Sequence, residues 1–464
     1  MSDDINHVRA TKEKLDQVGP GFCVLKWTQQ TLYLQTGDNH SCYHPFPHKV
    51  QLADIQRSPA GLHNTAWKKQ QRKEMLEGGR PTECSFCWKV EDTGHLSDRV
   101  IHSAHHTTTE VQPAMNGDDY SVIKNLEWDA DYDPKFLEVN FGNVCNFKCG
   151  YCTPTVSNSW IDEIKQFGDY PIKSRQYSIG FLKDREYYAS DDETNPYVAA
   201  FWAWWPTLKH NLQTLRITGG EPTLNQNTWK LLDHLESDPC PHMTLLINSN
   251  LGVKPALIAR MSKKIKLLLD KKCIKDFRMH CSIDSWGTPA EYMRNGLECA
   301  VFEENFRTIL EDFKYINATV EIMVTYNNLA VASFRQLLVK ILEWRAEFSN
   351  DKQRIDFCTP HLKEPAHWTI NILPDSFQSY VAADIEFMKE HLNKGNTGFT
   401  DIEVERLARV LTVMQTYKPT VNELAEAKRD FAAFFTEHDR RRGTDFYAVF
   451  PEYIEFMENC KRTL

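Results

Sequence analysis

The stretch that decides the fold reads Glu138-Val-Asn-Phe-Gly-Asn-Val-Cys145-Asn-Phe-Lys-Cys149-Gly-Tyr-Cys152. It begins in a predicted strand, Phe136 to Asn140, and then places three cysteines on one short loop, spaced Cys145-x3-Cys149-x2-Cys152. Three thiolates can bind three irons of a cubane cluster and leave the fourth iron open, whereas a pure electron carrier usually closes the cube with four cysteines. The spacing therefore indicates a cluster that binds and reduces a ligand. A zinc knuckle is the alternative interpretation of such a group of thiolates.

Two further features accompany the three cysteines. Tyr151 stands directly before the third cysteine, and the segment Thr218-Gly219-Gly220-Glu221-Pro222 follows along the chain. With these motifs in this order, the chain resembles the radical S-adenosylmethionine (SAM) enzymes. The resemblance implies that the three cysteines hold a [4Fe-4S] cluster, that Tyr151 lies at the cofactor, and that reductive cleavage of SAM supplies a 5'-deoxyadenosyl radical. Catalytic acid, base or relay residues stay unassigned.

The resemblance also places SAM contacts at the ends of predicted strands. Glu221 is expected to accept hydrogen bonds from the methionine ammonium, and Gly219 and Gly220 to permit close backbone approach. Short polar side chains are expected to reach the methionine carboxylate and the ribose, namely Asn248, Ser249, Asn250, Ser282 and Asp284. Such residues are also ordinary turn formers. Arg294 is expected to pair with the methionine carboxylate, with a surface salt bridge as its alternative.

Residues 132–375 alternate short apolar segments with stretches of helical periodicity. The expected strands are Phe136 to Asn140, Thr214 to Thr218, Met243 to Asn248, Arg278 to Ile283, Ala318 to Thr325 and Trp368 to Leu373. Six such units predict an α/β fold with a parallel sheet and right-handed crossovers. Ligands collect at the carboxyl ends of such strands, where the cysteine loop and the Gly-Gly-Glu-Pro turn both lie. The resemblance implies that residues 132–375 form a partial (β/α)6 TIM-like barrel, the radical SAM core.

The two flanking regions differ from this core. Residues 1–125 are rich in His, Cys and polar turns, and we expect a compact module stapled by bound metal. Residues 376–464 look helical, and we interpret them as a helical region that packs on the core. Within it, Thr420-Val-Asn-Glu423 predicts a capping box that opens a helix toward Arg442, and Gly443 is the expected stop.

A second set of cysteines lies in the N-terminal region. Cys23 and Cys42 flank Gly37, which would turn a hairpin and bring them side by side, and a Cys-x2-Cys pair follows at Cys84 and Cys87. This arrangement is similar to the auxiliary half of the SPASM and twitch modules of radical SAM maturases. It implies a second, fully ligated [4Fe-4S] cluster, with a tetrahedral zinc site as the alternative. In the best-known members this module follows the barrel, whereas here it precedes it.

Further segments resemble the twitch branch, namely Ser282-Ile-Asp-Ser-Trp-Gly287, Glu291-Tyr-Met-Arg294 and Val449-Phe-Pro-Glu452. The other cysteines follow no ligand spacing and are expected to be small buried hydrophobes; they are Cys240, Cys273, Cys281, Cys299, Cys358 and Cys460.

The amino-acid composition and net charge limit the classes of function that the chain can have. With 41% hydrophobic and 25% charged residues the chain is of ordinary globular type, and its net charge of −9 does not favour a general nucleic-acid surface. No long apolar run or signal pattern occurs, so we expect a cytoplasmic protein that does not enter a membrane. Thirteen cysteines in such a protein favour thiolate ligation over disulfides.

These observations lead to a radical SAM enzyme that abstracts hydrogen from a substrate. Relatives with auxiliary modules modify peptides or protein side chains, which makes a peptide the leading substrate, and a flavodoxin- or ferredoxin-type protein the expected electron donor. Two alternatives stay open. One is modification of a small molecule or nucleoside, and the other is a non-catalytic iron-sulfur redox or sensing protein.

Overall fold

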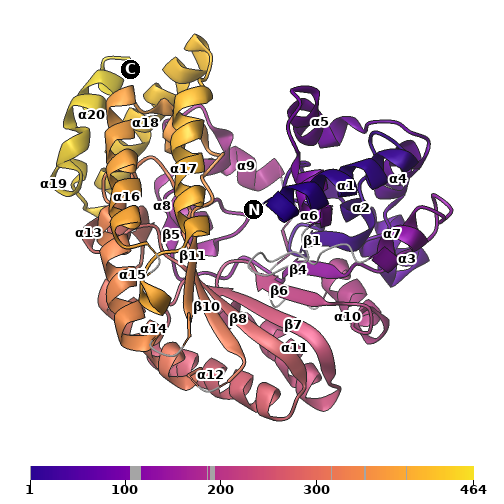
Figure 1. The fold of residues 1–464 in the computed structure, drawn as a ribbon. Coiled ribbons are helices and arrows are strands. Elements are labelled where there is room, and N and C mark those ends of the chain that lie inside the picture. The colour runs from indigo at the N-terminus through magenta and orange to yellow at the C-terminus, as the bar shows by residue number, and fades with distance from the viewer. Residues whose placement is uncertain are drawn as a thin grey trace.

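A computed structural model describes residues 2–104, 117–184, 187–188, 194–314, 316–349, 352–392 and 394–463. The chain forms a mixed α/β structure around a nine-stranded sheet in the order β11-β10-β8-β7-β6-β4-β1-β2-β3. Figure 1 shows the sheet with the N-terminal elements on one side and the C-terminal helices on the other.

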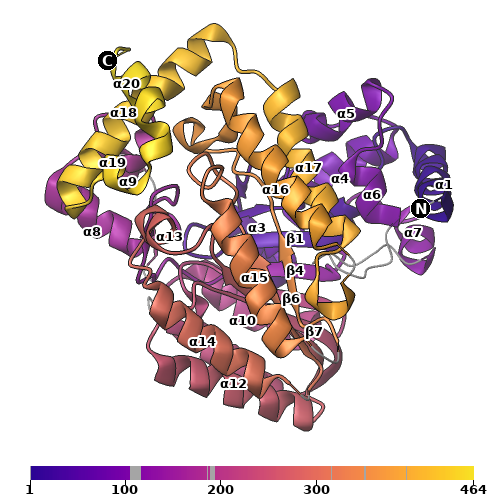
Figure 2. The ribbon, with the colours of Figure 1, turned by 60° about the vertical axis from the view of Figure 1, so that its left-hand side comes forward.

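Seven neighbouring strands of the sheet run parallel, and six of them follow the chain in order from β4 to β11. These six are β4 (Phe136–Asn140), β6 (Thr214–Thr218), β7 (Cys240–Ser249), β8 (Ile274–Ser282), β10 (Ala318–Met323) and β11 (Ile355–Cys358). The connecting helices are α8 (Asn158–Phe167), α9 (Ile179–Asp184), α10 (Pro196–Leu208), α11 (Gln226–Ser237), α12 (Pro255–Asp270), α13 (Thr288–Met293), α14 (Cys299–Asp312) and α15 (Phe334–Phe348). Figure 2 shows α12, α14 and α15 stacked along one face of the sheet.

The sixth of these strands does not lie where the sequence pattern predicts it. The segment from Trp368 to Leu373 forms two short 3-10 helices, Ala366–Trp368 and Ile370–Ile372, and β11 takes the sixth place by pairing with β10. The predicted segment is apolar because Trp368, Ile370 and Ile372 are buried in the core, and burial alone does not distinguish a strand from a short helix. The first five predicted strands are confirmed, with differences at their ends.

The N-terminal region joins the same sheet. Strand β1 (Gln29–Tyr33) pairs parallel with β4, and β2 (Asp38–His40) and β3 (His48–Lys49) extend the edge as antiparallel strands. Gly37 turns the chain between β1 and β2 with a φ of +68°, as predicted. The helices of this region are α1 (Ser2–Val18), α2 (Leu25–Thr28), α3 (Leu52–Arg57), α4 (Ala66–Leu76), α5 (Ser85–Asp92), α6 (Asp98–Ala104) and α7 (Gly117–Ile123). The domain limits expected at 125 and 375 stay a prediction.

The C-terminal region is helical, as expected. It comprises α16 (Gln378–Glu390), α17 (Asp401–Thr416), α18 (Val421–Arg442), α19 (Phe446–Val449) and α20 (Ile454–Lys461). Thr420 and Glu423 form the predicted capping box of α18, and Gly443 ends the helix in the left-handed conformation at a φ of +65°. Both helix-end predictions are therefore confirmed.

Within the described ranges, none of the helices has both the length and the apolar character that a membrane span requires.

Candidate functional site

The loop with Cys145, Cys149 and Cys152 leaves the carboxyl end of β4 and is held on both sides. The backbone N–H of Cys145 donates to Asn158 Oδ1 at 2.9 Å, and Ser159 Oγ donates to the Cys145 carbonyl oxygen at 2.7 Å. Cys149 lies in the short strand β5 (Lys148–Cys149), which pairs antiparallel with β9 (Arg294–Asn295). The loop is therefore fixed by both α8 and the segment around Arg294.

The three thiols are close enough to influence one another. The hydrogen bond from Cys152, followed by the positive charge of Arg294, holds the pKa of the Cys149 thiol below its usual value although burial opposes this. Burial, followed by the charge of Cys149, raises the pKa of Cys145 to about 12. Two N–H groups face the Cys145 sulfur, the Phe147 backbone at 3.4 Å and Asn250 Nδ2 at 3.9 Å. Such N–H donors and a nearby arginine suit thiolates that ligate iron.

The Gly219-Gly220-Glu221 turn packs on the backbone of the cysteine loop. The Gly220 N–H donates to the Gly142 carbonyl at 3.2 Å, and the Glu221 N–H donates to the Val144 carbonyl at 2.7 Å. A Cβ on Gly220 would lie 2.2 Å from the Val144 oxygen, and Gly219 has a φ of +126°. Glycine is thus required at both positions by the close approach of two chain segments.

The Glu221 carboxylate is almost fully buried and accepts hydrogen bonds within the protein. Its donors are Thr223 Oγ1 at 2.7 Å, the Asn250 N–H at 2.7 Å and Ser249 Oγ at 3.0 Å, with the Thr223 N–H at 3.1 Å. Burial raises its pKa, and these bonds oppose the rise. The carboxylate therefore joins the turn after β6 to the end of β7. Its expected bond to the SAM ammonium stays a prediction.

The three polar residues at the end of β7 contact two different parts of the structure. Ser249 and Asn250 are buried around Glu221, and Asn250 also donates to Asn146 Oδ1 at 2.9 Å on the cysteine loop. Asn248 instead accepts a 2.9 Å hydrogen bond from Arg216 Nε on β6. The first two residues therefore lie at the cysteine loop, and Asn248 lies on the face of the sheet that carries Arg216.

Asp284 and Arg294 form a buried ion pair. Arg294 Nε and Nη2 donate to the two Asp284 carboxylate oxygens at 2.9 and 2.8 Å, and Tyr151 Oη donates to the same carboxylate. Asp284 has no exposed surface and Arg294 is 5% exposed, so the surface salt bridge considered as the alternative for Arg294 is wrong. Chain reversal through α13 brings the two residues together. Ser282, half-buried, ends β8 in register with Met323 of β10.

The second cysteine set lines one small cavity. Cys23, Cys42, Cys84 and Cys87 all face a cavity of about 100 Å³, together with Arg99 and His102 of α6. Burial raises the pKa of all four thiols, to about 12 for Cys42 and about 11 for Cys87. The structure thus brings together the four cysteines that the sequence grouped, at distances short enough for their charges to interact. The metal they would hold stays a prediction.

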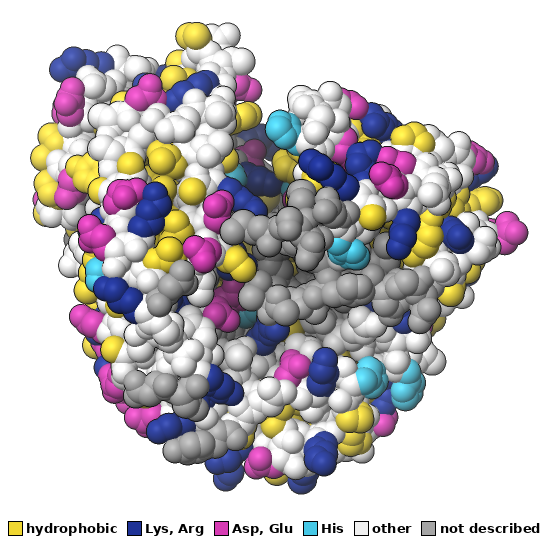
Figure 3. Space-filling view, viewed as in Figure 1, with side chains coloured by type: hydrophobic (Ala, Val, Ile, Leu, Met, Phe, Trp, Pro, Cys, Tyr) yellow, Lys and Arg dark blue, Asp and Glu magenta, His cyan; other side chains and the backbone are white. Residues whose placement is uncertain are grey.

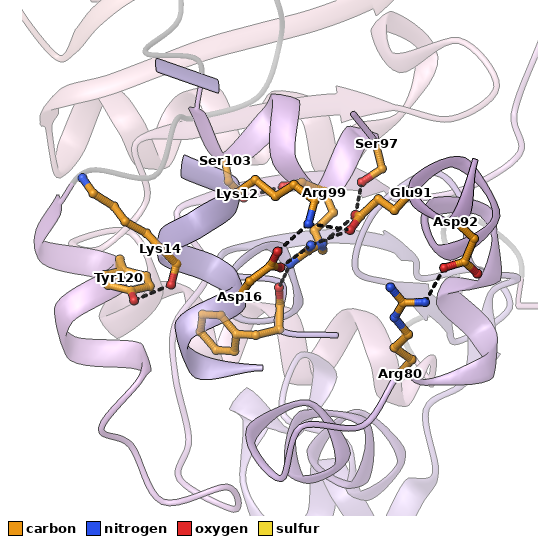
Figure 4. Close-up of polar contacts among 11 residues, drawn as sticks. Lys12, Lys14, Asp16, Arg80, Glu91, Asp92, Ser97, Arg99, Ser103 and Tyr120 are labelled. Carbon is orange, nitrogen blue, oxygen red and sulfur yellow. Dashed lines mark hydrogen bonds and ion pairs between the residues drawn. The ribbon is translucent and has the colours of Figure 1, made fainter. Parts of the chain in front are cut away.

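Arg99 anchors the wall of this cavity (Figure 4). Its guanidinium donates to Glu91 Oε1 and Oε2 at 2.8 and 2.7 Å and to Asp16 Oδ1 of α1 at 2.9 Å. A fourth bond of 2.7 Å reaches the carbonyl oxygen of Phe22, the residue before Cys23. The cation is 1% exposed, and its charge is balanced by the buried carboxylate of Glu91 and by Asp16, whose side chain is 33% exposed. Arg99 therefore joins α1 and α5 to the chain at Cys23.

A larger cavity, of about 870 Å³, adjoins the four-cysteine cavity. Tyr43 and Asp98 line both cavities. The larger one extends to the inner face of the sheet at Arg216 and Met323 and to α17 at Arg409. Figure 3 shows the molecule hollowed between the α16–α17 side and the α5–α6 side, with basic side chains along the margins. No sequence pattern identified this site, because its lining comes from distant segments.

Among the residues that the structure describes, no three His, Cys, Asp or Glu side chains converge as the ligands of one metal ion would. The thiolates of a cubane each bind a different iron, so cluster ligands do not need to meet at one point. Five of the six cysteines without ligand spacing are buried, as expected, and Cys358 is half-buried beside the larger cavity.

Comparison with known proteins gives structural similarities at low identity. No family model and no curated protein matches the chain. One similar solved structure, native anSMEcpe with bound AdoMet, has a TM-score of 0.33 and 11% identity, covering 70% of this chain and 99% of its own. A second, native anSMEcpe with bound AdoMet and the Cp18Cys peptide, has a TM-score of 0.32 and 12% identity, covering 70% and 98%.

Proposed function

We propose that the protein is a radical SAM enzyme that acts on a peptide or protein side chain. The observation that carries the proposal is the packing of the Gly-Gly-Glu turn on the cysteine loop, where the Glu221 N–H bonds to the carbonyl oxygen directly before Cys145. This contact joins the two motifs at the carboxyl ends of β4 and β6, where ligands of a parallel sheet collect. We further propose that the six parallel strands and their helices form the partial (β/α)6 barrel of that superfamily.

Cys145, Cys149 and Cys152 would hold the [4Fe-4S] cluster. The donor set suits it, because three sulfurs lie on one fixed loop with N–H groups and Arg294 nearby. When bound, the cluster and SAM supply a carbon-centred radical that abstracts hydrogen. The chain's own residues bind and orient, with Tyr151, Gly219, Gly220, Asn248, Ser249, Asn250 and Ser282 as proposed SAM contacts around Glu221, Asp284 and Arg294.

Cys23, Cys42, Cys84 and Cys87 would hold a second [4Fe-4S] cluster. Their shared cavity supports this proposal, since four thiols around one space can ligate a complete cube. Tyr43 and Asp98 separate this cavity from the larger one, so the proposed second cluster would lie beside the space available for a substrate. We propose that it positions the substrate or accepts an electron from it, in the cytoplasm, with a flavodoxin- or ferredoxin-type donor reducing the first cluster.

Anaerobic reconstitution with iron, sulfide, SAM and dithionite tests the proposal through formation of 5'-deoxyadenosine. We expect the wild-type protein to form it, and Cys145→Ala, Cys149→Ala and Cys152→Ala each to abolish it, because two thiolates cannot retain the site-differentiated cluster. Cys240→Ala is the matched control, since this buried cysteine begins β7 away from the loop. Near wild-type cleavage in any of the three variants would end the assignment.

A further inference from the structure

The larger cavity carries more positive than negative charge. Four basic side chains line it, against two carboxylates, in a protein whose net charge is −9. The basic residues are Arg216, Lys363, Arg406 and Arg409, and the acidic ones are Asp98 and Glu321. A basic cavity in an acidic protein concentrates anionic ligands, because its field is set by the local charges.

Each carboxylate has a close neighbour besides these cations, although the charge of Lys363 also acts on Asp98, and those of Arg406 and Arg216 act on Glu321. Asp98 Oδ2 lies 2.6 Å from His44 Nε2. Glu321 lies 3.3 Å from His280 Nε2 and shares a hydrogen bond with the Cys358 thiol. By contrast, Lys363 and Arg409 form no ion pair with any residue in the described ranges, and Lys363 Nζ lies 5.0 Å from the Phe86 ring. Arg409, and Lys363, whose charge acts on Asp98 without a close ion pair, can therefore pair with a ligand.

Thr359 adds an uncharged group to this lining. Its side chain is 5% exposed, and its Oγ1 is buried without a hydrogen-bond partner in the described structure. A buried hydroxyl without a partner costs free energy, and such groups in native proteins are usually satisfied by water or a ligand. Thr359 stands next to Cys358 at the end of β11, and rotation of its side chain would turn the buried hydroxyl toward an oxyanion in the cavity.

The cavity also reaches the strand ends assigned above to the cofactor. Met323, which lines it, is the register partner of Ser282, and Arg216 bonds to Asn248. Its volume of about 870 Å³ is in the range of small-molecule and peptide side-chain sites. A ligand held at Arg409 and Lys363 would therefore extend toward the proposed SAM site.

We propose that this cavity binds the substrate through a carboxylate, which Lys363 and Arg409 pair with and Thr359 hydrogen-bonds. The carboxylate belongs either to an acidic side chain or to a peptide carboxyl terminus. The proposal rests on the proposed function, since it names the substrate class of that enzyme, but binding can be measured without turnover.

Calorimetry with the anaerobically reconstituted full chain tests it with four probes. The first is the blocked pentapeptide Gly-Gly-Glu-Gly-Gly, and the second is its Gln counterpart. The third is pentaglycine with a free carboxyl terminus, and the fourth is inorganic phosphate. We expect one of the two carboxylate probes to bind at least about tenfold more tightly than the Gln peptide, the typical effect of a charge-assisted hydrogen bond.

Lys363→Gln/Arg409→Gln should remove this preference, and Arg409→Lys should keep most of it because the charge is retained. Lys266→Gln on α12 is the control, as it removes one exposed positive charge away from the cavity. Equal or undetectable binding of carboxylate and Gln probes, or a preference that survives in the double variant, would overturn the proposal. Binding of phosphate alone would overturn the carboxylate assignment. Formation of 5'-deoxyadenosine by the same wild-type sample separates these failures from failure of the radical SAM assignment.

Discussion

The backbone N–H of Glu221 donates a 2.7 Å hydrogen bond to the carbonyl oxygen of Val144, the residue before the first cysteine of the loop. The bond joins two segments that stand 77 positions apart in the numbering, from Val144 to Glu221. It requires Gly220 to pass so close to the loop that no side chain fits. The cysteine loop and the Gly-Gly-Glu turn therefore form one structural unit.

Gly220→Ala should disrupt this unit. The added Cβ would meet the Val144 oxygen at 2.2 Å, a backbone contact that only movement of the loop can relieve. We expect loss of most 5'-deoxyadenosine formation and a lower iron content after reconstitution. Gly180→Ala is the control, because its Cβ would meet only side-chain atoms at 3.6 Å and beyond. Wild-type cleavage by Gly220→Ala would show that the turn does not fix the cluster loop.

Glu221→Ala should weaken SAM binding and leave the cluster in place. Its carboxylate holds Ser249 and Asn250 at the end of β7 and is the proposed partner of the SAM ammonium. Loss of such charge-assisted bonds costs roughly 1.5 to 3 kcal/mol, or about ten- to a hundredfold in affinity. Equilibrium binding of SAM to the reconstituted variant measures this, with the cluster absorbance as the check on iron. An unchanged affinity for SAM would mean that the Gly-Gly-Glu turn does not contact the cofactor.

The sequence allowed prediction of elements whose signals are local. The bounds of β4 and β6 match the predicted segments because short β-branched and apolar runs end in polar turns, and the Thr420 capping box is a four-residue pattern. Strand β1 was not predicted, because Gln29, Gln30 and Thr31 are polar although fully buried. Hydrophobic patterning cannot recognise a buried strand with such a composition.

In the candidate site, too, features with a local sequence signal were predicted and contacts between distant segments were not. Cysteine spacing grouped both thiol sets, and the structure brings each set together. The Asp284–Arg294 pair was missed because the reversal of the chain through α13 brings the two residues together. The basic cavity was missed because Lys363 and Arg409 line one cavity only after the chain folds. Contacts between distant segments leave no periodic signal in the sequence.

Glu163→Gln should destabilise the protein through the helix that supports the cysteine loop. Glu163 of α8 is buried against Arg442 at 3.2 Å and Lys148 at 2.8 Å, and Arg442 also donates to the Lys148 carbonyl beside Cys149. Removing one partner of a buried pair costs about 3 to 5 kcal/mol. Thermal unfolding at neutral pH measures the loss, and Glu426→Gln, whose pair with Lys173 is exposed, should cost less than about 1 kcal/mol. Equal midpoints for the two variants would contradict this prediction.

The effect of Glu163 should also depend on pH. Burial favours a higher pKa, but Arg442, Lys148 and Tyr170 outweigh it and hold the pKa at about 2. A carboxylate with a depressed folded-state pKa stabilises the fold above its unfolded pKa, and this stabilisation is lost as the pH falls through the folded value. The difference between wild type and Glu163→Gln should thus be full at pH 6 and shrink below about pH 4.3, the usual glutamate value. A difference that grew on acidification would contradict the assignment.

Cys84→Ala/Cys87→Ala separates the roles of the two thiol sets. Two cubanes predict about eight irons per chain, and the double variant should retain about four, since the first set lies on the loop that includes the separate β5–β9 pair and not at the four-cysteine cavity. We expect it to form 5'-deoxyadenosine but to leave the peptide unmodified, because the four-cysteine cavity adjoins the proposed substrate cavity at Tyr43 and Asp98. The yields of both products by mass spectrometry, compared in one reaction, measure this.

Metal analysis that found one zinc and four irons in the native protein would make the N-terminal site structural. If the double variant lost both 5'-deoxyadenosine and modified peptide in parallel, the four N-terminal cysteines would serve only to support the fold. If it lost neither, these cysteines would have no role in turnover, and a small-molecule substrate would be favoured.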